Sequence, residues 1–257
     1  MCLITFAIGQ NPRFPLVVAA NRDEFFHRPT ATMDWWQTDS GQHILAGRDL
    51  ASGGTWLAVA PDGRVTAVTN VREGSPETGR YSRGELPIRA LAEPEGKLQA
   101  GLAADTERYS GFNLVALAEH GGWYFSNRDA HPGRQLFRGH YGLSNHLLQT
   151  PWPKLLRLRS AFAHAVEQAN PDTNALHTRL LPLLQDTSPA PDRMLPDTGV
   201  GLETERFLSS PFVVGENYGT RATTIITQDI DGQLTVTEQS WGPGGKMLEK
   251  RQFSWQR

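Results

Sequence analysis

Residues 1–24 read MCLITFAIGQNPRFPLVVAANRDE, the most informative segment of the chain. Two apolar runs, residues 3–8 and 16–20, flank a Gly-Gln-Asn-Pro-Arg turn signal, which predicts a β-hairpin. If Ile8 pairs with Phe14, paired residue numbers sum to about 22, so Cys2 lies opposite Ala20 to within one or two residues. The next four residues are polar: Asn21, Arg22, Asp23 and Glu24. The hairpin therefore brings a dense polar cluster beside the thiol.

Composition limits the classes of protein to which the chain can belong. It has 257 residues, of which 39% are apolar and 20% charged, which is typical of a globular protein with a sizeable core. No apolar run approaches the ~18 residues of a membrane span. The net charge of −2 gives no electrostatic case for binding nucleic acid. Without a composition break or an internal repeat, we expect a single domain over residues 1–257.

The single cysteine, Cys2, sets the expected compartment and excludes some sites. One thiol allows neither an internal disulfide nor a multi-thiolate metal site, and the histidines lack metal-ligand spacing. No basic residue precedes the first apolar run, so the N-terminus does not resemble a secretory signal. We therefore expect a cytoplasmic, reducing location and no metal. The sequence predicts no oligomeric state.

The rest of the chain reads as strands at both ends with helices between them. A second hairpin is expected over residues 55–60 and 65–69, around Pro61 and Gly63. The capping pair Ser82 and Glu85 predicts a helix running to about Ala92. Further helices are expected over residues 98–103, 154–168 and 173–181, and a loop over 186–200. Further strands are expected over residues 112–117, 123–126, 141–144, 223–227, 234–239 and 247–255. This order of elements indicates an α+β fold with mostly antiparallel sheet.

Cys2 has two interpretations. A small residue at position 2 normally permits removal of Met1, which would give Cys2 both a thiol and a free α-amine. Because that amine has a pKa of about 7.7–8.0, it can act as the base for its own nucleophile. The polar tetrad would then bind the amine and lower the thiol pKa. Alternatively, Cys2 is a small buried residue at a strand start, and the tetrad is only a turn and a cap.

Other polar residues also have a chemical and a structural interpretation. Asn70 and Asn145 each end a predicted strand, where a carboxamide can donate to an oxyanion or simply form a turn. The nearby Arg72 and Arg83 either bind an acidic substrate group or belong to a solvated loop. His27 or Cys2 could ligate a non-covalently bound haem, or His27 could be an ordinary surface or hydrogen-bonded residue.

Several motifs, in order along the chain, carry a family resemblance. After Met-Cys come residues 21–29 (NRDEFFHRP), 53–57 (GGTWL), 67–70 (AVTN), 83–86 (RGEL), 111–114 (GFNL), 141–145 (YGLSN), 150–152 (TPW) and 218–221 (YGTR). The chain resembles the NRDE family, the homologues of transport and Golgi organisation protein 2. That family is in turn similar to N-terminal nucleophile hydrolases of the penicillin V acylase and choloylglycine hydrolase type. The resemblance implies a four-layer αββα sandwich.

The resemblance also implies roles for individual residues. Cys2 would be the nucleophile and its amine the base, with Asn70 and Asn145 in oxyanion and positioning roles. The expected catalytic residues are Cys2, Asn21, Arg22, Asp23, Glu24, Asn70 and Asn145. The expected substrate-binding residues are Arg72, Arg83, Arg221, His27 and Trp56. The tetrad departs from the order of such residues in the hydrolases.

Two functions follow as expectations. The first is a cysteine amidohydrolase acting on a small amide or acyl substrate, with no required cofactor. The second is a non-enzymatic protein that uses the same fold to bind and traffic haem, an acyl-lipid or acyl-CoA. Fold alone does not choose between them.

Overall fold

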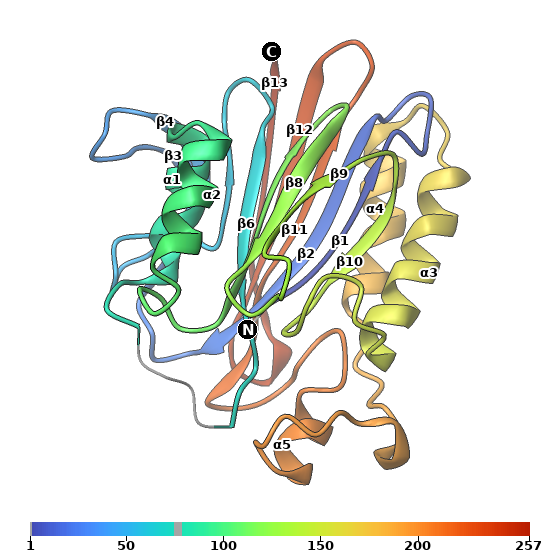
Figure 1. Cartoon of the computed structure of the whole chain (residues 1–257). Coiled ribbons are helices and arrows are strands. Elements are labelled where there is room, and N and C mark those ends of the chain that lie inside the picture. Colours follow the sequence, from blue (N-terminus) through green and yellow to red (C-terminus); the bar gives the residue numbers. More distant parts are fainter. Residues whose placement is uncertain (1, 75–78) are drawn as a thin grey trace.

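The structure is a computed structural model that describes residues 2–74 and 79–257 (Figure 1). Within these residues the strands form two sheets in which each pair of neighbours is antiparallel. In order across the first sheet lie β10 (Gly139–Leu143), β1 (Cys2–Ile8), β2 (Leu16–Phe25), β11 (Tyr218–Gln228), β12 (Gln233–Trp241) and β13 (Met247–Gln256). In order across the second lie β3 (Thr30–Gln37), β4 (His43–Asp49), β5 (Leu57–Val59), β6 (Val65–Asn70), β7 (Phe112–Ala118), β8 (Gly121–Ser126) and β9 (Gly133–Leu136).

The described residues form five helices, of which α1 to α4 cover the outer faces of the two sheets, whereas α5 lies at one end of the sandwich (Figure 1). They are α1 (Leu86–Ala92), α2 (Glu95–Ala104), α3 (Pro153–Glu167), α4 (Thr173–Leu184) and α5 (Leu202–Phe207), with 3₁₀ turns η1 (Arg83–Glu85), η2 (Asp192–Met194) and η3 (Pro243–Gly245). α3 and α4 pack on the first sheet, and α1 and α2 pack on the second. The expected four-layer αββα sandwich is therefore confirmed. No helix of the described residues is long and apolar enough to cross a membrane.

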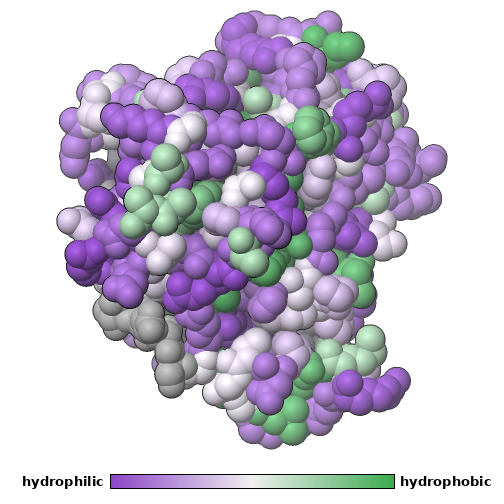
Figure 2. All heavy atoms as spheres, in the orientation of Figure 1, coloured by the Kyte–Doolittle hydropathy of each residue, from purple (hydrophilic) through white to green (hydrophobic). Residues whose placement is uncertain are grey.

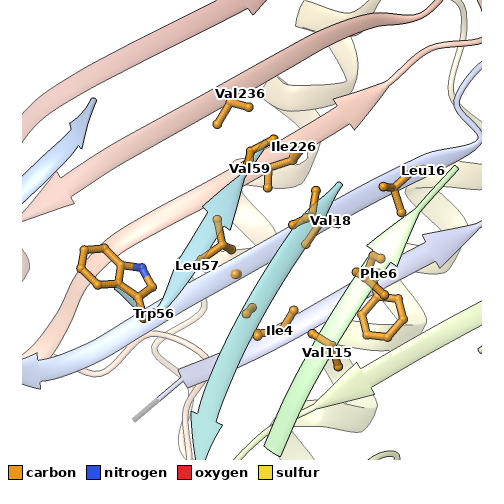
Figure 3. Close-up of a cluster of buried hydrophobic side chains, with 14 of the residues drawn as sticks. Ile4, Phe6, Leu16, Val18, Trp56, Leu57, Val59, Val115, Ile226 and Val236 are labelled. Carbon is orange, nitrogen blue, oxygen red and sulfur yellow. The ribbon is translucent and has the colours of Figure 1, made fainter. Parts of the chain in front are cut away.

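Period-two alternation in β1 and β2 builds two separate cores. Ile4 and Phe6 of β1 point toward the second sheet, where they meet residues such as Leu57 and Val115 (Figure 3). Leu3 of β1 faces the other way and packs under α3 and α4. Both faces of β1 are buried. A one-residue shift of register would therefore turn Cys2, Ile4 and Phe6 away from the second sheet and toward α3 and α4.

The first hairpin forms as expected, with a longer loop. Gly9 N–H donates to the carbonyl of Pro15 at 2.7 Å, and Ile8 pairs with Leu16 rather than with Phe14. Cys2 therefore pairs with Arg22, two residues beyond Ala20. The cause is Asn11, whose side-chain oxygen accepts from the backbone of the following loop residues and keeps Phe14 out of the strand.

Several elements differ from their predicted form. Ser82 accepts from Gly84 N–H at 3.2 Å, but its helix opens with the η1 turn before α1 begins. α4 continues to Leu184, beyond the predicted stop at Pro182. β3, β4, β9 and α5 were not expected, because β3 alternates polar and apolar residues weakly and β9 and α5 are short.

Candidate functional site

A cavity of about 820 Å³ opens at the end of the sandwich where β1 begins. Cys2, the first residue of β1, and Thr204 and Phe207 of α5 all line it. The cavity wall includes many of the residues that the sequence nominated: Cys2, Arg22, Asp23, Glu24, Trp56, Asn70, Arg72 and Arg83. These side chains come from β1, β2, β6 and η1, from the residue before β5 and from the segment after β6, so the fold collects them from both sheets.

Cys2 is the first residue of β1 and is only 8% exposed. Burial raises the pKa of its thiol above the ordinary value, and the positive charge of the paired Arg22 opposes part of that rise. A thiol with a raised pKa is protonated at neutral pH, and the thiolate is the nucleophilic form. Chemistry at this sulfur therefore needs a base that removes the proton.

Arg22 is held rigidly beside Cys2. Its guanidinium carbon lies 4.2 Å from the centroid of the Trp56 ring, and the residue is 5% exposed. A Cβ on Gly47 would lie 2.1 Å from the same indole, so only glycine leaves room for the Trp56 ring. Stacking on an aromatic face fixes a guanidinium at a small entropic cost. The sequence motif around Trp56 therefore serves to position Arg22.

Acidic residues balance this charge at the cavity mouth. Arg22 Nη2 lies 3.7 Å from Glu24 and 3.8 Å from Asp49. Arg28 donates from Nε to Asp49 at 2.6 Å and lies 3.9 Å from Glu24. The result is a four-residue ion-pair network made of Arg22, Glu24, Arg28 and Asp49, which couples β2 to the end of β4.

Asp23 is buried beside the thiol, at 1% exposure. Its Oδ1 accepts from the hydroxyl of Thr220 at 2.7 Å. The pairing of β2 with β11 shifts register between Thr220 and Ala222, which accommodates Arg221 as the extra residue. This bulge fixes the carboxylate from the neighbouring strand.

Asn70 and Asn145 meet, although they are far apart in the chain. Nδ2 of Asn145 donates to Oδ1 of Asn70 at 3.0 Å and to its backbone carbonyl at 3.2 Å. Asn70 lines the cavity, whereas Asn145 is completely buried behind it. With Oδ1 engaged, the Nδ2 end of the Asn70 carboxamide is the donor that can face a ligand. Asn145 thus acts on the site through Asn70.

Two arginines line the cavity on the side of β6. Arg72 donates to Glu205 at 2.5 Å, and burial lowers the pKa of Arg72 below its ordinary value. Arg83 donates from Nη1 to the carbonyl of Gly111 at 3.0 Å. Burial also lowers the pKa of Arg83 below its ordinary value. Arg72 is buried and Arg83 is half-buried, and both side chains line the cavity.

Four of the nominated residues lie outside the cavity wall: Asn145, which is buried behind Asn70, and Asn21, Arg221 and His27. Asn21 lies on the opposite face of β2, where Nδ2 donates to the carbonyls of Leu184 at 2.7 Å and Pro211 at 2.9 Å. Arg221 donates to the carbonyls of Phe25 and Arg28, at 3.0 and 2.5 Å. The ring of His27 lies 5.3 Å from that of Phe25. The geometry therefore gives Asn21 and Arg221 structural bonds, and sets His27 outside the wall.

Sequence reasoning missed several residues of the site. Tyr218 and Arg28 line the cavity and lie inside the family motifs, which was the available signal. Lys154 is 2% exposed, donates to the carbonyl of Leu208 at 2.9 Å, and has its pKa lowered by burial to about 8. Nothing local in the sequence distinguishes Lys154 or Glu205 from surface charges of a helix. Among the described residues, no group of three or more metal-ligating side chains comes together.

Comparison with known proteins identifies the family. A family model described as Transport and Golgi organisation 2 matches residues 1–243. The Transport and Golgi organization protein 2 homolog of Bos taurus is 36% identical over 262 residues, covering 93% of this chain and 93% of its own. The homolog of Homo sapiens is 34% identical over 275 residues, covering 100% of this chain and 96% of its own.

Two solved structures are also similar. The Caenorhabditis elegans N-acylethanolamine-hydrolyzing acid amidase ortholog matches with a TM-score of 0.44 and 12% identity, over 88% of this chain and 92% of its own. The C2A mutant of the conjugated bile acid hydrolase from Clostridium perfringens matches with a TM-score of 0.48 and 7% identity, over 99% and 97%. The family match and the identities of the relatives, together with the NRDE motifs, lead to one conclusion. The chain belongs to the Transport and Golgi organisation 2 family.

Proposed function

We propose that this protein is a cysteine amidohydrolase in which Cys2, after removal of Met1, is an N-terminal nucleophile acting on a small amide or acyl substrate. Met1 lies outside the described residues. The observation that carries the proposal is the buried thiol of Cys2 in the wall of a large cavity, beside Arg22, Asp23 and Asn70. The proposal includes a cytoplasmic location, since a single free thiol suits a reducing compartment.

In the first step the α-amine of Cys2 takes the thiol proton, and the sulfur attacks the carbonyl carbon of the amide. A base is needed because burial raises the pKa of the thiol, and an α-amine titrates near neutrality. The carbonyl oxygen becomes an oxyanion that the Asn70 carboxamide stabilises by donation. The C–N bond then breaks, the ammonium returns the proton to the leaving amine, and a thioester remains on Cys2.

In the second step the same amine deprotonates a water molecule. The hydroxide attacks the thioester, the C–S bond breaks, and the carboxylic acid leaves while the thiol regains its proton. Asp23, held by Thr220, would bind and orient the α-amine through both steps. Arg22 supports the thiolate, because its charge lies beside the sulfur and counters the effect of burial.

The proposal is tested by separating the thiol from the amine. Wild type and Cys2→Ala are treated with an activated ester such as p-nitrophenyl acetate, together with a chain that carries extra residues before Cys2. We expect a burst of nitrophenolate followed by turnover in wild type, and neither in Cys2→Ala. The extended chain retains the thiol but has no α-amine on Cys2, so its turnover should be lost. Equal turnover with and without the extension would contradict the mechanism.

A second candidate is a non-enzymatic carrier of haem, an acyl-lipid or acyl-CoA. The observation that favours it is the apolar part of the cavity wall, formed by Val68, Val71, Val200, Phe207 and Leu208. Hydrophobic side chains also reach the surface around α5 (Figure 2), where Leu202 and Phe207 are exposed. A carrier would bind haem or acyl-CoA saturably with the N-terminus blocked. If titrations of the extended chain showed no saturation, the carrier function would be excluded.

A further inference from the structure

One edge of the guanidinium of Arg72, a residue of the cavity wall, has no hydrogen-bond partner among the described residues. Nη1 is engaged by Glu205, but Nε and Nη2 are buried and have no hydrogen-bond partner within residues 2–74 and 79–257. The side chain is only 4% exposed and belongs to the cavity wall. Nε and Nη2 form one side of the planar group, and their two N–H bonds are parallel. This edge is the one that binds a carboxylate in a bidentate manner.

The rest of the residue is fixed in place. The guanidinium carbon lies 4.8 Å from the centroid of the Trp152 ring. The backbone N–H of Arg72 donates to the carbonyl of Asn145 at 2.7 Å. A buried donor without an acceptor is rare in folded proteins and marks a place where a ligand or solvent supplies one. The stacking on Trp152, the ion pair with Glu205 and the backbone hydrogen bond together fix the orientation of the unpaired Nε–Nη2 edge, which lowers the cost of binding such a ligand.

Position along the chain links this edge to the nucleophile. Arg72 follows Asn70 by two residues, and Asn145 bonds to both: its side chain to Asn70 and its carbonyl to Arg72. Cys2, Asn70 and Arg72 all line the same cavity. A ligand with its reacting carbonyl at Cys2 and Asn70 can therefore extend to Arg72 within a cavity of about 820 Å³.

Charge favours a singly charged ligand group. The cations near the edge are Arg72 and Lys154, and the carboxylates acting on them are those of Asp23 and Glu205. These four charges cancel when all are ionised. A monoanion is attracted by the unpaired N–H groups of Arg72 and is not repelled by a net negative charge around them. A dianion would place twice that charge in the same buried site. A carboxylate satisfies this condition better than a phosphate ester.

We propose that the Nε–Nη2 edge of Arg72 binds a carboxylate of the ligand, so that the amide processed at Cys2 carries a free acid, as an N-acyl amino acid does. The identity of the ligand as an amide rests on the proposed hydrolase function. The anion site itself is independent of turnover.

The test compares matched acids and amides. N-Acetyl-, N-benzoyl- and N-octanoylglycine are each titrated beside the corresponding glycinamide into Cys2→Ala protein by calorimetry, which measures binding without hydrolysis. A charged hydrogen-bonded pair predicts that at least one acid binds about tenfold or more tighter than its amide. Arg72→Lys, which retains the charge but lacks the edge, should lose most of this preference. Arg80→Met removes an exposed arginine paired with Asp105 and should keep it.

Removing Arg72 alone leaves Glu205 buried without its partner, so Arg72→Met is made together with Glu205→Gln. The inference is wrong if no acid binds tighter than its amide in the Cys2→Ala protein. It is also wrong if the preference survives in Arg72→Lys and in the double variant. Tight acid binding without any hydrolysis by the wild type would instead refute the proposed hydrolase and retain the carboxylate site.

Discussion

Replacing Asn70 with alanine separates its chemical role from its structural one. Asn145 loses the bond to Oδ1 of Asn70 but keeps the bond to the backbone carbonyl, so one of two hydrogen bonds disappears. The loss of one such bond lowers the free energy of unfolding by about 1 kcal/mol. Removal of one oxyanion donor lowers the acylation rate by about 100- to 1,000-fold, which is about 2.7–4 kcal/mol of transition-state stabilisation. Activity should therefore fall far more than stability.

The assay measures nitrophenolate release in a single turnover and urea denaturation on the same preparations. Asn127→Ala is the matched control. Asn127 lies on the loop after β8, accepts from Phe112 N–H at 2.9 Å and donates to two loop carbonyls, at 3.1 Å each. It should lose stability and keep its acylation rate. An Asn70→Ala acylation rate within threefold of wild type would refute the oxyanion role.

Two further predictions concern the fold. Burial lowers the pKa of His177 from 6.5 to about 4, so between these pH values the unfolded chain binds more protons. The free energy of unfolding should therefore fall by roughly 3 kcal/mol as the pH drops through this window. Urea midpoints measured at each pH should show a smaller fall in His177→Gln than in wild type. Equal pH dependence of the two proteins would contradict this. In Gly54→Ala the added Cβ meets the carbonyl carbon and oxygen of Gly84 at 2.4 Å, which should lower the free energy of unfolding by about 1–3 kcal/mol. Gly96→Ala, with no atom within 4 Å, is its control, and equal stability of the two variants would count against the clash.

The sequence predicted the fold where local signals were strong. The apolar runs of β1 and β2, with a turn signal between them, predicted the hairpin, and the apolar stripe along α3 predicted that helix. The four-layer arrangement was predicted from the resemblance to a family. The second sheet was predicted less completely, because β3 is half exposed and β9 has four residues, so neither carries a clear period. The loop-length error at Asn11 arose from a side-chain bond that hairpin statistics do not contain.

The candidate site was predicted in part, for a physical reason. Hairpin arithmetic brought Cys2 near Arg22, because antiparallel pairing depends only on local sequence. The same arithmetic did not predict on which face of β2 Asn21 lies. The predicted pairing was uncertain by up to two residues, and a shift of one residue reverses the face. The meeting of Arg72 with Glu205, separated by 133 residues, depends on tertiary packing that no local pattern encodes.

Mass spectrometry can show whether Cys2 is both the terminal residue of the mature chain and the nucleophile. Protein from its native host is incubated with an amide acyl donor, quenched in acid and digested. We expect an N-terminal peptide that begins at Cys2 and carries the acyl group as a thioester on that residue. A peptide that retains Met1 and carries no acyl group, from protein that hydrolyses the amide, would contradict it.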